Sequence, residues 1–343
     1  MIIFHITKQL NRTKTSKNYR DIQISWCASC FPFAPSVYIA SHMKLLPSIL
    51  RTHLHKLFNL YIPTTSLKLG YFHNSNMNVH ATNAQAQFFK SLHVPGRPLL
   101  LANIHDPSTA RIVASLPGCK ALATASASLS LVNNTDDDNL SLEAQLAAVR
   151  DIAAVARETG KPLTVDLQDG YGKRLEEAVR GMIALGVVGI NLEDSDQKTH
   201  AMTDEVVAVQ RIKRALAAAA EVGVPDFVVN ARSDSFLRGG ALDESIRRGK
   251  LYLDAGATTI YILNGSQRLT REDVKKIVDS LQGRVNIALR LPKPDTATDT
   301  LSSKDLTDLG VARVSIGPQL YFVAMEATKR AAAKVFEVDG ANI

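Results

Sequence analysis

Cysteine is scarce in this sequence. Its 343 residues include only three, Cys27, Cys30 and Cys119. Cys27 and Cys30 have C-x-x-C spacing, but no second pair and no βαβ pattern follows them, which argues against a zinc site and against thioredoxin-type redox chemistry. Cys119 stands alone and is predicted to pack as a small apolar residue. The sequence therefore implies no disulfide framework.

Long apolar runs and glycine-rich phosphate motifs are also missing. No uninterrupted apolar run approaches the roughly 18–20 residues that a membrane-spanning helix needs, so we expect no membrane partner. Neither a G-x-G-x-x-G nor a Walker pattern is present, which argues against a dinucleotide site and a P-loop nucleotide site.

Acidic residues are almost absent from the first 76 positions. This segment holds nine Lys and Arg and a single acid, Asp21, whereas residues 77–343 hold 31 basic and 32 acidic residues. The nearly neutral remainder lacks the basic surface that nucleic-acid binding needs, so we expect no nucleic-acid partner. Within it, the run Arg247-Arg248-Gly249-Lys250 is predicted to be a solvated helix face rather than a phosphate cluster.

The first 76 residues allow two interpretations. The basic, hydroxyl-containing composition of residues 43–76 is typical of an organelle transit peptide. Alternatively, the segment is a mis-assigned or alternative gene start, because Met77 directly precedes the first ordered pattern. In both cases we predict a disordered leader over residues 1–76 and a folded domain over residues 77–343. The protein is expected in the cytoplasm, or in mitochondria if the leader is real.

Past Met77, short β-branched or apolar runs alternate with amphipathic stretches. Eight strands are predicted, at Leu99–Ile104, Ala121–Ala125, Leu163–Leu167, Gly189–Asp194, Phe227–Ser233, Thr259–Asn264, Val285–Arg290 and Arg313–Gly317. The predicted helices include Leu142–Thr159, Arg174–Leu185, Asp204–Val222, Leu242–Ala255, Thr270–Leu281 and a last one at Leu320–Phe336. Glycines able to take the left-handed conformation after a helix stand at Gly160, Gly186, Gly223 and Gly256.

This alternation predicts a parallel sheet, because a parallel crossover is long enough to hold a helix. Eight such units in about 240 residues match a closed barrel better than an open doubly wound sheet. The open sheet would need a glycine-rich turn after the first strand, and the turn here reads Asn103-Ile104-His105-Asp106-Pro107. We therefore predict the α/β class and a (β/α)8 barrel of the TIM type.

Polar residues collect at the predicted C-terminal strand ends, where such a barrel places its chemistry. Three acids, Asp166, Glu193 and Asp137, are expected to meet over the barrel mouth. With Gln168 beside them they form an oxygen-rich set, which favours Mg²⁺, with Mn²⁺ as the alternative, over zinc. Arg232 can clamp a carboxylate or phosphonate bidentately. The competing interpretation, separate helix caps, explains one acid more easily than three that face an arginine.

At these positions the chain resembles the isocitrate lyase and phosphoenolpyruvate mutase superfamily, over nearly all of residues 97–336. The resemblance rests on five motifs in the right order: Ala123-Thr124-Ala125-Ser126, Val165-Asp166-Leu167-Gln168-Asp169-Gly170-Tyr171-Gly172, Leu192-Glu193-Asp194, Asn230-Ala231-Arg232-Ser233-Asp234 and Gly310-Val311-Ala312-Arg313-Val314-Ser315-Ile316-Gly317. It implies a homotetramer whose last helix is exchanged between subunits.

The resemblance also implies a ligand set for the metal. Asp166 would bind Mg²⁺ directly, and Gln168 and Glu193 would hold it through water. Asp137 falls where members of the superfamily keep an acid near the metal-bound waters. Gln168 is a departure, because many members have a carboxylate there, and the lost charge is expected to weaken metal affinity.

The same resemblance implies how a substrate would be held. Thr124, Ala125 and Ser126 would present backbone amides and a hydroxyl to the substrate carboxylate. Arg232 would bind the anionic end of the substrate. Asn103, at the end of the first predicted strand, joins them as a substrate-binding candidate.

The chain departs from the superfamily after the fourth strand. Typical isocitrate and methylisocitrate lyases carry a Lys-(Arg/Lys)-Cys-Gly-His loop whose thiol protonates the departing carbon. Here the segment reads Ser195-Asp196-Gln197-Lys198-Thr199-His200-Ala201-Met202, without cysteine. A typical isocitrate lyase is therefore not expected. Lys198, His200 and Tyr171 are the candidates for proton transfer, and a solvated loop position stays open as the other interpretation of Lys198 and His200.

Small oxo- or hydroxy-carboxylates are the expected substrates. The resemblance implies a magnesium-dependent lyase or hydrolase that breaks the C–C bond next to the oxo or hydroxy carbon of a di- or tricarboxylate, through an enolate. Carbon–phosphorus chemistry of the phosphonomutase kind and a non-catalytic, metabolite-binding relative remain as alternatives. The presence of Asp166, Glu193 and Arg232 together favours an enzyme.

Overall fold

The computed structural model describes residues 80–265, 267–291 and 300–336, and the predicted leader over residues 1–76 lies outside them. The strands are β1 (Leu99–Leu101), β2 (Leu122–Ala123), β3 (Leu163–Asp166), β4 (Val187–Glu193), β5 (Val228–Ser233), β6 (Thr259–Ile262), β7 (Val285–Ala288) and β8 (Arg313–Ser315). The α-helices are α3 (Asn83–Ser91), α4 (Pro107–Ala114), α5 (Ser126–Val132), α6 (Leu142–Thr159), α7 (Leu175–Ala184), α8 (Glu205–Glu221), α9 (Leu242–Asp254), α10 (Arg271–Ser280), α11 (Ser303–Asp308) and α12 (Gln319–Val335). Two short 3-10 helices, η2 (Asp137–Asn139) and η3 (Gly172–Arg174), follow α5 and β3.

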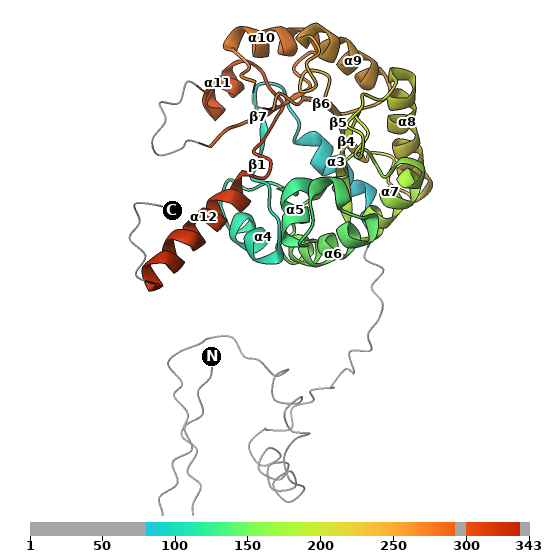
Figure 1. The fold of residues 1–343 in the computed structure, drawn as a ribbon. Coiled ribbons are helices and arrows are strands. Elements are labelled where there is room, and N and C mark those ends of the chain that lie inside the picture. Colours follow the sequence, from blue (N-terminus) through green and yellow to red (C-terminus); the bar gives the residue numbers. More distant parts are fainter. Residues whose placement is uncertain (1–79, 266, 292–299, 337–343) are drawn as a thin grey trace, which may run out of the picture. The chain divides into compact units, whose positions relative to one another are not determined.

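The eight strands form one parallel sheet that closes on itself. Its order is β1-β8-β7-β6-β5-β4-β3-β2. A parallel bridge between Ile104 and Thr124, just past β1 and β2, joins the two ends of this order. There the amide of Ile104 donates to the carbonyl oxygen of Ala123 at 2.8 Å. The fold is therefore the predicted (β/α)8 barrel, with its helices arranged around the outside (Figure 1).

The predicted elements are present; seven strands are shorter than predicted, whereas β4 begins two residues earlier than predicted, at Val187. β1 ends at Leu101 rather than Ile104, and β7 ends at Ala288 rather than Arg290, because the chain leaves the sheet there to form the loops of the barrel mouth. The helix predicted over Leu142–Thr159 has the same bounds in the structure. Gly160 follows it with φ 66°, in the left-handed region that glycine tolerates.

Helix α3 is absent from the sequence prediction, although Thr82 and Gln85 form a capping box at its start. Its Phe89 is fully buried. A Cβ atom at Gly189, on β4, would lie 2.9 Å from Cε1 of Phe89. Glycine at this position thus allows the ring to pack against the amino-terminal end of the barrel.

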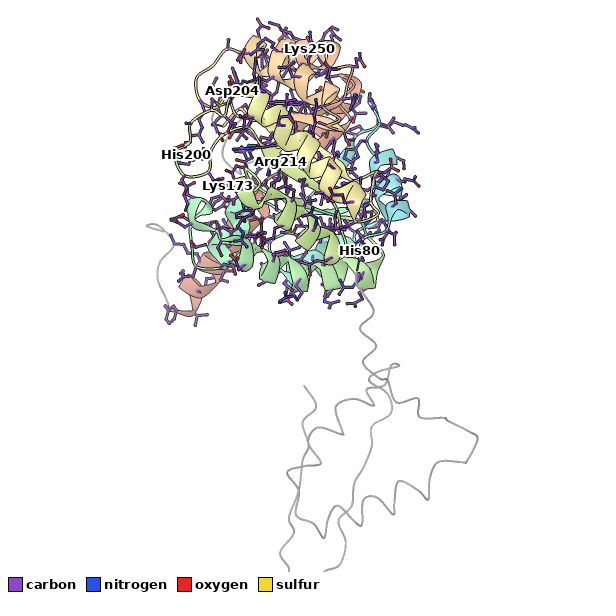
Figure 2. The ribbon with its side chains drawn as sticks, turned by 90° about the vertical axis from the view of Figure 1, so that its right-hand side faces the viewer. His80, Lys173, His200, Asp204, Arg214 and Lys250 are labelled. Atoms are coloured by element: carbon purple, nitrogen blue, oxygen red, sulfur yellow. The ribbon has the colours of Figure 1, made fainter. Side chains whose placement is uncertain are left out.

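The two ends of the barrel differ in what they carry. In side view, Lys173 and His200, which lie in loops after β3 and β4, are on the left, and His80, which precedes α3, is at the lower right (Figure 2). The loops that follow the strands therefore gather at the face opposite α3. No helix in the described part of the chain is both long enough and apolar enough to cross a lipid bilayer.

Candidate active site

Asp166 ends β3 and is buried at the barrel mouth, with 8% of its surface exposed. Its Oδ2 atom accepts hydrogen bonds from the amide of Ser126 at 3.2 Å and from the Ser126 hydroxyl at 3.1 Å. Its own amide donates to Oγ1 of Thr124 at 3.2 Å. Oδ1 has no hydrogen-bond partner. The structure thus fixes the carboxylate through one oxygen and leaves the other unpaired.

Gln168 lies two residues beyond Asp166, with φ 55°. Its Nε2 donates to the carbonyl oxygen of Asp137 at 2.6 Å and to Oδ1 of Asp137 at 2.9 Å. Its Oε1 is buried without a partner. Burial, together with the negative charge of Asp166, raises the pKa of Asp137 above its usual range. The predicted association of Gln168 with Asp137 is therefore a direct contact.

Glu193 and Arg232 meet at the ends of β4 and β5. Oε1 of Glu193 lies 2.5 Å from Nη1 of Arg232. Asp234 accepts from Nε of the same guanidinium at 2.6 Å and from Nη2 at 2.9 Å. Burial opposes the charged form of Arg232, but the charges of Glu193 and Asp234 raise its pKa well above the ordinary value. Arg232 is consequently charged and held by two buried acids.

These residues offer oxygen donors that suit a magnesium ion with few protein ligands. Among the residues that the structure describes, no three His, Cys, Asp or Glu side chains are placed to hold a metal by themselves. Mg²⁺ commonly binds one or two carboxylates and keeps several waters. The unpartnered, buried Oδ1 of Asp166 and Oε1 of Gln168 fit that mode of binding.

The predicted substrate-binding residues at the end of β2 lie against Asp166. Ala125 is the N-cap of α5, between Thr124 and Ser126, and both of these neighbours contact Asp166. Asn103 is placed differently. Its Nδ2 donates to the Thr124 carbonyl at 2.7 Å, and its Oδ1 accepts the amides of residues 316 and 317 at 3.1 Å each. Asn103 therefore ties the ends of β1, β2 and β8 together, and its contact with a substrate stays a prediction.

The segment Ser195–Met202 after β4 is a closed loop. Ser195 and Met202 form an antiparallel bridge, and the amide of Thr203 donates to the Asp194 carbonyl at 2.8 Å. Inside the loop, Asp196 accepts the amide of Thr199 at 2.8 Å. The loop is thus fixed at its base by main-chain bonds and within its turn by the Asp196 side chain.

The tip of this loop contacts η2, which carries Asp137. Nζ of Lys198 donates to Oδ1 of Asn139 at 2.7 Å and also to the Asp138 carbonyl. Nε2 of His200 lies 3.1 Å from Oδ2 of Asp138. Both side chains remain partly exposed, but each has a specific partner, so the loop joins the Arg232 side of the mouth to the Asp137 side.

Tyr171 is linked to Asp166 through a residue that the sequence did not single out. The Tyr171 hydroxyl donates to Oε1 of Gln145 at 2.6 Å, and Nε2 of Gln145 donates to the Asp166 carbonyl at 2.5 Å. Burial raises the pKa of Tyr171 above its ordinary value, so the phenol keeps its proton. The sequence could have pointed to Gln145, because this polar residue lies on the apolar face of α6, between Leu142 and Val149.

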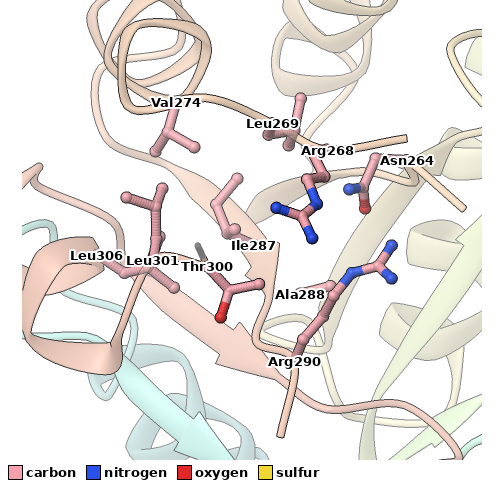
Figure 3. A pocket seen from close by; sticks show the side chains of 10 residues that line it. All are labelled: Asn264, Arg268, Leu269, Val274, Ile287, Ala288, Arg290, Thr300, Leu301 and Leu306. Carbon is pink, nitrogen blue, oxygen red and sulfur yellow. The ribbon is translucent and has the colours of Figure 1, made fainter. Parts of the chain in front are cut away.

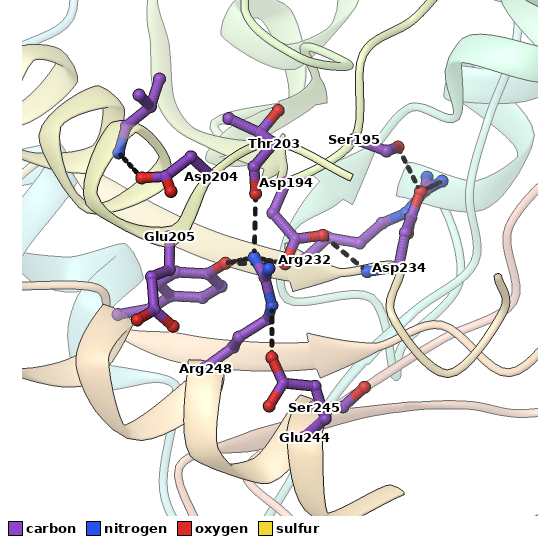
Figure 4. Close-up of polar contacts among 12 residues, drawn as sticks. Asp194, Ser195, Thr203, Asp204, Glu205, Arg232, Asp234, Glu244, Ser245 and Arg248 are labelled. Atoms are coloured by element: carbon purple, nitrogen blue, oxygen red, sulfur yellow. Dashed lines mark hydrogen bonds and ion pairs between the residues drawn. The ribbon is translucent and has the colours of Figure 1, made fainter. Parts of the chain in front are cut away.

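A second group that the sequence did not predict lies behind Arg232 (Figure 4). Asp194 accepts the Tyr252 hydroxyl at 2.6 Å and the Asp234 amide at 2.7 Å. Arg248 pairs with Asp194 at 3.5 Å and donates to the Thr203 carbonyl at 3.1 Å. The expectation of a solvated helix face is therefore wrong for Arg248, whose side chain is 12% exposed because α9 turns it toward the barrel.

A small cavity lies beside β6 and β7, between α10 and α11 (Figure 3). It holds about 40 Å³, and its polar lining includes Asn264, Arg268 and Arg290. Such a volume has room for a few water molecules. The cavity is too small to be the binding site of a dicarboxylate.

Comparison with known proteins gives one consistent family. Residues 89–336 match the family model of phosphoenolpyruvate phosphomutase. Phosphonopyruvate hydrolase of Variovorax sp. (strain Pal2) is 29% identical over 250 residues, which are 70% of this chain and 83% of that protein. The 2,3-dimethylmalate lyase of Eubacterium barkeri is 28% identical over 186 residues, 52% of this chain and 62% of that protein.

A solved structure agrees with these relatives. The crystal structure of phosphonopyruvate hydrolase in complex with oxalate and Mg²⁺ superposes with a TM-score of 0.63 and 26% sequence identity. The match covers 75% of this chain and 89% of that one. That relative therefore shares the barrel and binds a small dicarboxylate together with magnesium.

Proposed function

This chain belongs to the isocitrate lyase and phosphoenolpyruvate mutase superfamily, and from that premise we propose that it is a magnesium-dependent lyase or hydrolase of small di- or tricarboxylates. The bond that it breaks is the C–C bond next to an oxo or hydroxy carbon. The observation that carries the proposal is the pair of unpartnered, buried oxygens on Asp166 and Gln168. The charged Arg232 lies on β5 and contacts Glu193 at the end of β4, the strand next to β3.

Asp166 would hold the magnesium ion directly, and Gln168, Glu193 and Asp137 would hold it through water. When bound, the ion supplies the positive charge that stabilises an enolate as the bond to the neighbouring carbon breaks. The oxalate and Mg²⁺ complex of the related phosphonopyruvate hydrolase supports this pairing of metal and carboxylate.

Thr124, Ala125 and Ser126 would receive the substrate carboxylate beside Asp166, and Arg232 would bind the far anionic end. Arg232 already has two carboxylate partners, Glu193 and Asp234. A singly charged carboxylate therefore meets less repulsion there than a doubly charged phosphonate. This balance of charge favours cleavage between carbon atoms.

Proton transfer is assigned to three residues near the mouth. Lys198 and His200 lie on the loop that contacts η2, and they can protonate a carbanion at the open side of the site. Tyr171 keeps its proton because burial raises its pKa, so it can act as a donor but not as a base near neutral pH.

Cleavage of a C–P bond is the second candidate. It is favoured by the 29% identity with phosphonopyruvate hydrolase over 70% of the chain. It would require Arg232 to accept a phosphonate despite its two acid partners.

A substrate panel tests the proposal. Oxaloacetate, 2-methylisocitrate, 2,3-dimethylmalate and phosphonopyruvate would each be assayed with Mg²⁺ and after EDTA treatment. We expect turnover of a carboxylate that Mg²⁺ restores after chelation. Turnover of phosphonopyruvate alone would replace the first candidate by the second, and EDTA-resistant turnover would refute both.

We also propose that α12 is exchanged between subunits of a homotetramer. None of its residues is buried within the chain. Its apolar side chains include Phe322 and Val323, which are 55% and 54% exposed. A neighbouring subunit would cover this surface and remove its apolar area from water.

The compartment depends on the leader. We propose a cytoplasmic enzyme if translation starts at Met77, and a mitochondrial one if residues 1–76 are made and cleaved. N-terminal sequencing of the native protein distinguishes these starts.

A further inference from the structure

Arg313 begins β8 and is the largest fully buried side chain in the described part of the molecule, 1% exposed. Its Nη2 donates to Oδ1 of Asn191 at 3.1 Å. Asn191 belongs to β4, four strands away from β8 in the order of the eight-stranded sheet. The side chain therefore spans the inside of the barrel from one wall to the opposite one.

The side chains that surround its hydrogen-bond partner Asn191 are polar and neutral. Barrels of this kind are usually filled by layers of Val, Ile and Leu. Here Asn230 donates to Asn191 at 2.9 Å and accepts the Thr259 hydroxyl at 2.6 Å. Nε and Nη1 of Arg313 have no hydrogen-bond partner, and no described carboxylate pairs with the guanidinium.

The guanidinium lies close to the acids of the candidate site. Asn191, which it contacts, is the register partner of Asp166 on the neighbouring strand. Neighbouring strands are about 4.8 Å apart, so the two residues leave the barrel wall side by side. Glu193 follows two positions later on β4 and faces the same interior. Burial lowers the pKa of Arg313 to about 10, against the opposing charge of Asp166, so the group is protonated at neutral pH.

The charges of the site explain why a buried cation is retained without an ion pair. The charge of Arg232 acts on four acids, Asp137, Asp166, Glu193 and Asp234. An isolated buried guanidinium is costly, and so is a group of carboxylates held together out of water. The electrostatic attraction between the Arg313 guanidinium and the carboxylates offsets both costs, although no direct ion pair forms.

We propose that Arg313 is a positioning residue that acts as the internal counter-charge of the active-site carboxylates. It stabilises them before a metal binds, and its charge opposes the binding of a divalent cation in front of them. This inference rests on the proposed magnesium site. It assigns Arg313 no contact with the substrate.

The test compares neutral and charged replacements in the full chain. Arg313→Met removes the charge and keeps most of the length, whereas Arg313→Lys keeps the charge. Mg²⁺ affinity is measured by titration calorimetry, and the metal-free melting temperature by calorimetric scanning. We expect Arg313→Met to bind Mg²⁺ about tenfold more tightly and to melt at a lower temperature without metal. Arg313→Lys should keep the wild-type Mg²⁺ affinity.

Arg284→Met is the matched control, because Arg284 is a partly buried arginine that bonds to the carbonyls of residues 257 and 258 and to no residue of the candidate site. It should lower the melting temperature without changing Mg²⁺ affinity. If Arg313→Met does not fold, Arg313→Gln, which also removes the charge but keeps a polar group, carries the same test.

A purely structural role gives a different pattern. Unchanged or weaker Mg²⁺ binding by the neutral variants would overturn the inference. If the wild type binds no Mg²⁺, the proposed function fails, and the metal-free melting temperatures still decide the role of Arg313. A lower melting temperature in the neutral variants alone supports the role of Arg313 as a counter-charge. An equally lowered melting temperature in Arg313→Lys refutes it.

Discussion

The side-chain amide of Gln168 donates twice to Asp137, at 2.6 Å to its carbonyl oxygen and at 2.9 Å to its Oδ1. The resemblance to the superfamily implies a carboxylate at this position. In this chain an amide reaches the acid that a carboxylate would repel. Glutamine at this position therefore removes one negative charge and adds hydrogen bonds that fix the segment bearing Asp137.

Gln168→Glu is expected to lower the stability of the metal-free protein by about 1–3 kcal/mol, because a buried acceptor loses its donor and meets a like charge. The same change should increase the stabilisation by Mg²⁺. Thermal unfolding with and without Mg²⁺ measures both effects. Gln87→Glu is the control, since Gln87 makes a similar bond to Asp226 on the surface. Equal effects of the two substitutions would contradict this account.

Asp166→Asn should abolish Mg²⁺-dependent turnover, with a loss of about 10³-fold or more, because the charge that binds the ion is removed. The carboxamide oxygen can still accept from Ser126, so the fold should be kept. Turnover of the best substrate of the panel and circular dichroism measure these outcomes. Asp151→Asn, on the exposed face of α6, should leave turnover unchanged. Mg²⁺-dependent turnover by Asp166→Asn would refute the role of Asp166 as the magnesium ligand.

Arg248→Met should loosen the loop Ser195–Met202, because Arg248 holds both the Thr203 carbonyl and Asp194. Trypsin cleavage after Lys198 reports this opening. We expect cleavage about tenfold faster than in the wild type, which corresponds to about 1.4 kcal/mol. Arg247→Met removes a neighbouring exposed arginine that pairs with Glu205 and Glu244, and it should not change the rate. Equal rates in the two variants would show that Arg248 does not anchor the loop.

Acid should destabilise the fold through His93, which follows α3. Its Nδ1 lies 3.0 Å from the Phe89 carbonyl oxygen, and its Nε2 is buried without a partner. Burial lowers the pKa of His93 to about 3. Between pH 3 and 6.5, His93 is therefore protonated in the unfolded chain but neutral in the folded one. Stability is highest above pH 6.5 and falls below it, by at most about 1.4 kcal/mol per pH unit.

Urea unfolding at pH 7 and pH 5 measures this dependence. His93→Asn should remove much of the loss between the two pH values, because asparagine does not titrate. His80→Asn, at an exposed position before α3, should retain it. An unchanged loss in His93→Asn would rule out His93 as its source.

Phe322→Asp should break the proposed tetramer. A charge placed on the apolar surface of α12 would have to be buried at the subunit contact, which is costly. Size-exclusion chromatography with light scattering measures the mass. Lys213→Asp introduces the same acid at an exposed position of α8 and should leave the assembly intact. A wild-type monomer, or a tetramer that survives Phe322→Asp, would refute the exchange.

The sequence by itself determined the barrel and the composition of its mouth. Strand and helix periodicity are local properties, and glycines such as Gly160 mark where helices end, so the order of elements could be predicted. The acids Asp166 and Glu193 directly end buried strands, and parallel strands bring their carboxyl ends to one face. That rule placed them in one site before any contact was known.

Only the tertiary structure decided how those residues are paired. Register and barrel closure bring Gln168 to Asp137, Arg248 to Asp194 and Arg313 to Asn191, across 31, 54 and 122 positions of sequence. The sequence prediction therefore treated Arg248 as solvated and gave Arg313 no role. Periodicity fixes which face of an element is buried, but a side chain's partner depends on the strand that closure places opposite it.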